Sequence, residues 1–219
     1  MRKKPVELLN KTIANTRASI VFSFALVLYL LPCLALAQPI MVGQKKKAQV
    51  DSCKHTLKEG VLLVRLKTRS NTIKGLMRNN QVKMATELKT KTEQFNQQVI
   101  KAFQSKYDYS KVLFFADTLS DLVRKGAFDK IYWLNEKLQP DSSCHLKPSA
   151  FVLTAEFGNL NDPTLGVAAL KVMNQQFEEL CYPFPYLVRT YDQFPSFLRR
   201  SPEETVNLLN KRLWGKKKQ

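Results

Sequence analysis

Few residues in this chain could carry out acid–base, nucleophilic or metal chemistry, and they are scattered along it. Only two histidines, His55 and His145, are present. A metal site needs several convergent ligands, and the neighbours Cys144 and His145 would point to opposite sides of an extended chain. The sequence contains no C-x-x-C, G-x-S-x-G, H-E-x-x-H or glycine-rich phosphate loop. We therefore predict no metal and no cofactor, and we lean towards a protein that is not an enzyme.

Polar residues near the ends of predicted strands are the candidates for an active site. In an open α/β sheet, such a site lies beyond the carboxyl ends of the parallel strands. Four residues fit this position: Thr68, Arg69, Asp117 and Glu156. Each also has a structural interpretation, since Asp117 would cap the next helix and Glu156 would pair with a lysine. An envelope hydrolase or oxidoreductase acting here is the alternative to a binding function.

Basic residues on the predicted strands could form a second kind of site. They are Arg65, Lys67, Lys171 and Arg189. The whole chain has 35 Lys and Arg against 18 Asp and Glu, a formal net charge of +17, which favours anionic partners. We predict that this basic face binds an anionic envelope component or a membrane surface, and we expect no nucleic acid. The alternative is scattered charge that keeps the protein soluble.

The first 37 residues have the pattern of an export signal. A basic segment precedes an apolar run over Ile20–Leu34, and small residues stand where a signal peptidase reads the chain. We predict cleavage between Ala37 and Gln38, and a periplasmic or extracellular location. A retained N-terminal membrane anchor is the alternative, because the apolar segment approaches the roughly 18–20 residues that span a bilayer.

Three cysteines follow the predicted cleavage site: Cys53, Cys144 and Cys181. An odd number cannot form a closed disulfide framework, so at most one pair and one free thiol fit. We favour Cys144 with Cys181, because both lie in proline-containing connections beside predicted strands.

Hydrophobic patterning predicts one α/β domain over residues 60–214, between a loose basic arm over 38–59 and a basic tail over 215–219. The run Val112–Ala116 is apolar throughout, which is typical of a strand covered on both faces in the middle of a sheet. We expect the strand over 60–67 to lie beside it in parallel.

The remaining patterns complete a mixed sheet of five or six strands. Apolar residues spaced three, four and seven apart predict a helical hairpin after the first strand, broken at Asn79-Asn80. Ser201-Pro202 with two following acids predicts the start of a C-terminal helix. Further strands are predicted over 131–134, 150–157, 167–173 and 186–191, the last at a sheet edge.

Five segments of the chain carry a resemblance to a known group of proteins: Val64–Thr68, Leu113–Asp117, Ala155–Gly158, Pro183–Tyr191 and Ser201–Leu213. In these segments the chain resembles an uncharacterised family of small exported bacterial α/β proteins. The resemblance implies no functional residue, because the function of that family is unknown. The order of strands is also similar to thioredoxin folds, which without a C-x-x-C implies architecture alone. Our leading hypothesis is a non-enzymatic accessory or interaction protein of the bacterial cell envelope.

Overall fold

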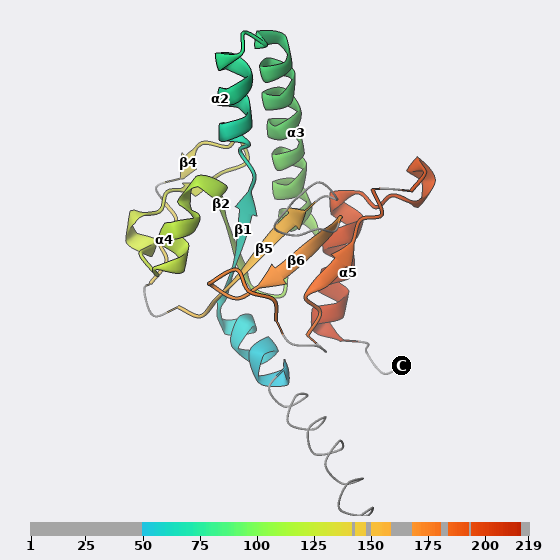
Figure 1. Ribbon diagram of the computed structural model, residues 1–219. Helices are drawn as coiled ribbons and strands as arrows, with labels where there is room; N and C mark the ends of the chain where they lie inside the picture. Colours follow the sequence, from blue (N-terminus) through green and yellow to red (C-terminus); the bar gives the residue numbers. More distant parts are fainter. Residues whose placement is uncertain are drawn as a thin grey trace, which may run out of the picture. The chain divides into compact units, whose positions relative to one another are not determined.

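A mixed five-stranded sheet organises the computed structural model (Figure 1). Its strand order is β2-β1-β5-β6-β7; β1 pairs in parallel with β2 and β5, whereas β5–β6 and β6–β7 are antiparallel. The strands are β1 (Val61–Leu66), β2 (Lys111–Ala116), β5 (Val152–Gly158), β6 (Ala169–Met173) and β7 (Leu187–Arg189). The predicted α/β class, the parallel pairing of the first two long strands and the edge position of the last strand are confirmed.

The structure describes residues 50–141, 143–147, 150–158, 168–180, 184–192 and 194–215. These residues belong to one compact unit. The predicted signal with its cleavage site at Ala37 and Gln38 lies outside the described residues, as do residues 216–219 of the predicted tail.

Helices cover both faces of the sheet. The predicted hairpin is confirmed as α2 (Ser70–Arg78) and α3 (Val82–Lys106), and Asn80 between them is left-handed at φ 56°. The predicted final helix is α5 (Pro202–Trp214), where Ser201 and Glu204 form a capping box. The shorter elements are α4 (Ser120–Arg124), η1 (Asp117–Leu119), η2 (Phe128–Lys130), η3 (Ser196–Leu198), β3 (Trp133–Leu134) and β4 (Pro140–Asp141). No helix among the described residues is long and apolar enough to cross a bilayer.

Two hydrophobic clusters lie on opposite faces of the sheet. On one face α3 and α5 pack through residues such as Phe103 and Leu209. On the other face the residues around α4, η2 and β3 surround Phe115. Phe114 belongs to the first cluster and Phe115 to the second, so β2 is covered on both sides. The predicted double coverage of this strand is confirmed.

The predicted position of this strand in the middle of the sheet is wrong. β2 is an edge strand of the five-stranded sheet, next to β1 only. Coverage of the two faces depends on helices above and below a strand, whereas a middle position depends on hydrogen-bonded neighbours on both sides. A run of apolar residues therefore indicates that both faces of a strand are covered, but it does not indicate that the strand has neighbours on both sides.

The predicted loose arm also requires a correction in its last part. Residues 50–59 are helical, and Val50 and Leu57 are buried with Cys53 packed against them. Their spacing of three and four places them on one helical face. The helix ends at Gly60, where a Cβ atom would come within 2.5 Å of the Phe151 carbonyl oxygen. The folded unit therefore begins before residue 60.

A polar contact holds the C-terminal end of α5 to the connection between α3 and β2. The Asp108 carboxylate accepts hydrogen bonds from Trp214 Nε1 at 2.7 Å and from Asn210 Nδ2 at 2.8 Å. These two bonds lower the pKa of Asp108 below its ordinary value.

The Phe115→Ala substitution should lower the free energy of unfolding by about 4 kcal/mol, because it opens a cavity at a fully buried site. Urea denaturation measures the change. Met84→Ala at an exposed position is the control and should change stability by less than about 0.5 kcal/mol. An equal loss in both variants would contradict the proposed packing.

Stability should fall with decreasing pH partly through Asp108. Because its pKa is lowered in the folded state, its contribution is present above about pH 4 and is lost as pH falls through the lowered value. Asp108→Asn should therefore lose less stability than the wild type between neutral and acid pH. Thermal unfolding across this range measures it, and identical pH profiles would contradict the role of this carboxylate.

Candidate functional site

The predicted strand-end residues Thr68 and Asp117 lie together at the carboxyl edge of β1 and β2. Thr68 Oγ1 donates a hydrogen bond of 2.6 Å to Asp117 Oδ1. The parallel pairing of β1 with β2 produces this contact, since Leu66 and Ala116 stand opposite each other and both chains leave the sheet on the same side. Asp117 thus contacts the neighbouring strand connection, and no side-chain cap forms at α4. The contact joins two connections of the fold.

Glu156 is the most buried of the predicted site residues, with 1% of its surface exposed. Its carboxylate accepts a hydrogen bond of 2.8 Å from Arg65 Nη1 and lies 3.2 Å from Lys67 Nζ. Arg65 stands directly opposite Glu156 on the adjacent strand. The expected pairing of Glu156 with a basic residue is therefore present, and a buried carboxylate requires such a partner.

The predicted basic face is largely neutralised. Arg65 and Lys67 pair with Glu156, and Lys171 forms an ion pair with Glu179. Strand register places Lys171 beside Glu156 and Arg189 beside Ala169, so these side chains share one side of the sheet. The Arg65 guanidinium also lies 5.1 Å from the ring centroid of Phe177. Within the described part of the chain, Arg189 is the one of the four whose side chain has no such contact.

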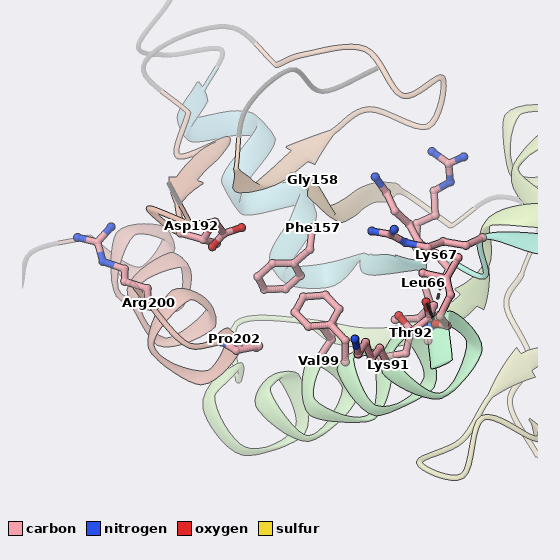
Figure 2. Close-up of a pocket in the computed structure, with 16 residues that line it drawn as sticks. Leu66, Lys67, Lys91, Thr92, Val99, Phe157, Gly158, Asp192, Arg200 and Pro202 are labelled. Carbon is pink, nitrogen blue, oxygen red and sulfur yellow. Dashed lines mark hydrogen bonds between the residues drawn. The ribbon is translucent and has the colours of Figure 1, made fainter. Parts of the chain in front are cut away.

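A cavity of about 340 Å³ lies where α3 extends past the carboxyl ends of β1 and β5. Figure 2 shows the side chains around it. The buried Asn96 on α3 donates a hydrogen bond of 2.9 Å to the carbonyl oxygen of Lys67, which fixes the helix against the end of β1. The start of α5 closes another side through Pro202.

The floor of the cavity is apolar and aromatic. Phe95 of α3 and Phe157 of β5 meet edge to face, with ring centroids 5.8 Å apart and planes at 89°. Leu66, Leu88 and Val99 continue this surface. Phe95 is still 42% exposed, which shows that the surface is open to a ligand.

The charges around the floor are unevenly distributed. Lys67 and Lys91 lie on one side of Phe157, whereas Asp192 and Arg200 lie on the other (Figure 2). Arg65 and Arg69 also line the cavity, and Arg69 has the left-handed backbone angle φ 52° at the start of α2. Arg200 is engaged, since it donates to the Arg189 carbonyl oxygen at 2.9 Å and stacks over Tyr191. Lys67, Arg69 and Lys91 thus line one end of the cavity, whereas the Arg65 guanidinium is bonded to Glu156 on the opposite face of the sheet.

Thr190 supplies a buried polar group in the wall of the cavity. Thr190 is 5% exposed, and its hydroxyl oxygen has no hydrogen-bond partner among the described residues. A buried hydroxyl without a partner is energetically costly, and a bound polar group would satisfy it.

Arg65, Lys67 and Arg69 were recognised from the sequence, but most of the cavity was not. The lining residues that the sequence did not identify include Lys91, Phe95, Asn96, Thr190 and Asp192. One signal was available: the apolar stripe of α3 includes Leu88 and Phe95 and is longer than a strand of the sheet could cover. Thr190 and Asp192 follow β7 in a connection whose position depends on the tertiary fold.

The cysteines and histidines do not assemble into a site within the part of the chain described. Cys144 is a free thiol whose Sγ lies 3.6 Å from Asp141 Oδ2. Its predicted disulfide partner, Cys181, lies outside the described residues, so the structure does not show the pair. Burial raises the pKa of Cys53, which makes this thiol less reactive. His55 and His145 are exposed, and no three potential metal ligands converge among the described residues.

No protein-family model, curated protein or solved structure matches this chain. The likeness to thioredoxin folds is therefore not confirmed, and the resemblance to exported bacterial proteins stays a prediction.

The Glu156→Gln substitution should lower the free energy of unfolding by about 3 kcal/mol, because it leaves Arg65 and Lys67 without their carboxylate. Their partial exposure keeps the loss at the lower end of the range for buried pairs. Glu93→Gln breaks an exposed pair with Lys89 and should cost less than about 0.5 kcal/mol. Chemical denaturation compares the two, and a small loss for both would contradict the structural role of Glu156.

Proposed function

We propose that this protein is a non-enzymatic binding protein of the bacterial cell envelope, and that its cavity takes an anionic molecule with an apolar part. The observation that carries the proposal is the combination of an aromatic floor with a cluster of cations in one cavity. The envelope location rests on the predicted export signal.

The anionic part of the ligand would lie at the end that Lys67, Arg69 and Lys91 line. One carboxylate, Glu156, contacts this group through Lys67. Lys91 and Arg69 have no acidic partner among the described residues, so the end keeps a positive potential.

The apolar part would cover Phe95 and Phe157. Burial of apolar surface contributes roughly 25 cal/mol per Å², so contact with the exposed Phe95 ring and the half-buried Phe157 ring makes a substantial part of the affinity. Asp192 stands across the cavity from the cations (Figure 2). Arg200 lies on the same side and offsets the charge of Asp192, so the lysine end is the more positive of the two, and this asymmetry orients the ligand.

Binding is favoured over catalysis because the polar residues at the strand ends are engaged in contacts within the fold. Thr68 bonds to Asp117, and Glu156 bonds to Arg65. A general acid or base needs a proton-transfer group directed at a substrate, whereas the cavity presents mainly fixed cations and apolar surface.

The test is calorimetric titration with dodecanoate, which joins a carboxylate to an apolar chain. Lys91→Glu reverses a charge in the cavity and should weaken dodecanoate binding about thirtyfold, because an attraction of roughly 1 kcal/mol becomes a repulsion of similar size. The wild-type affinity should also fall as salt is raised.

Lys101→Glu is the matched control, since Lys101 is an exposed residue of the same helix outside the cavity. It makes the same change in net charge and should leave the affinity within about twofold of the wild type. Equal weakening by both variants would assign the effect to overall charge. Dodecanol binding as tight as dodecanoate binding would remove the anionic part of the proposal.

A further inference from the structure

An exposed apolar tip lies between β7 and α5. It consists of Phe194, Phe197 and Leu198, which are 42%, 82% and 49% exposed. Phe197 and Leu198 belong to the short helix η3, which projects from the folded unit beside α5 (Figure 1). Such exposure of three neighbouring large apolar side chains usually marks an interaction surface.

The fold holds these side chains outward. Arg199 Nε donates a hydrogen bond of 2.7 Å to the carbonyl oxygen of Phe194, and Leu198 N donates one of 2.9 Å to that of Pro195. Tyr191 packs edge to face on Phe194, with ring centroids 5.7 Å apart. Hydrogen bonds and a ring contact therefore give the tip a defined conformation.

Arginines lie next to the apolar residues of the tip. Arg199 follows it directly, and Arg200 is held against the Tyr191 ring and the Arg189 carbonyl oxygen. Residues 189–200 contain three arginines, Arg189, Arg199 and Arg200, and a single acid, Asp192. An apolar tip with a cationic base complements an anionic lipid surface, where acyl chains lie beneath negatively charged headgroups.

We infer that this tip inserts into the surface of a bilayer that contains anionic lipids. Phenylalanine and leucine side chains insert into the headgroup boundary of a bilayer, and the two phenylalanines with Leu198 give the tip a shallow, reversible insertion. A protein partner would need a broader surface, on the order of 800 Å² on each side. The tip is also continuous with the cavity wall, since Thr190, Asp192 and Arg200 line the cavity. Insertion of the tip into a bilayer does not depend on the ligand that we propose for the cavity.

A tryptophan reporter at the tip tests the inference in the full chain. Phe197→Trp should give a difference spectrum, relative to the wild type, that shifts to shorter wavelength with phosphatidylglycerol vesicles. Brominated acyl chains should quench it. Met84→Trp places the same reporter at an apolar position of α3 that is 57% exposed, and its spectrum should not change. This local readout is independent of any membrane contact by the N-terminal segment.

A second variant measures how much the tip contributes. Phe197→Trp combined with Phe194→Ser and Leu198→Ser should need about tenfold more lipid for a half-maximal shift, because two apolar contacts are lost. Phosphatidylcholine vesicles should give a weaker shift than phosphatidylglycerol vesicles, and salt should reduce the difference.

Three results would overturn the inference. They are an unshifted Phe197→Trp spectrum with anionic vesicles, an equal shift for Met84→Trp, and unchanged lipid dependence after removal of Phe194 and Leu198. A shift that appears without lipid and depends on protein concentration would instead identify a second copy of the chain as the occupant. Because dodecanoate titration reads the cavity and this assay reads the tip, failure of one does not imply failure of the other.

Discussion

The length of α3 relative to the sheet determines where this protein has a cavity. With 25 residues the helix extends about 37 Å, whereas six-residue β1 extends about 20 Å. Its C-terminal half is anchored by Val99, Ile100 and Phe103, all buried against the sheet. Its other half continues past the strand ends, where part of its apolar stripe has no strand beneath it. The cavity occupies this space, so the packing that stabilises the core also leaves an aromatic surface exposed.

The charged residues in the sheet explain why cations gather near one carboxylate. Arg65, Glu156 and Lys171 stand in one row across β1, β5 and β6. Glu156 compensates the nearest basic groups, and Glu179 compensates Lys171. The fold thereby tolerates several cations near the core, since each buried charge has an opposite charge within reach. Lys67, which lines the cavity, is held by Glu156, and a fixed cation binds an anion without a large cost in conformational entropy.

The cavity and the exposed tip share one connection, the segment between β7 and α5. Thr190 and Asp192 face the cavity, while Phe197 is the most exposed large apolar residue described. The capping box at Ser201 fixes the end of this segment, because it starts α5 at a defined residue. A molecule bound to a lipid surface through the tip would hold the cavity close to that surface. Molecules with both a charged and an apolar part concentrate at such a lipid surface.

Local patterns alone were enough to identify most elements. The break at Asn79-Asn80 and the start of α5 at Ser201 depend on neighbouring residues, and both were predicted correctly. The edge position of β2 and the burial of Leu57 could not be read in this way, because they depend on contacts between distant parts of the chain. The cavity likewise depends on contacts between distant parts of the chain. Lys67, Lys91, Phe157 and Asp192 come from four separate segments, and only the packing of α3 and α5 against the strand ends brings them together.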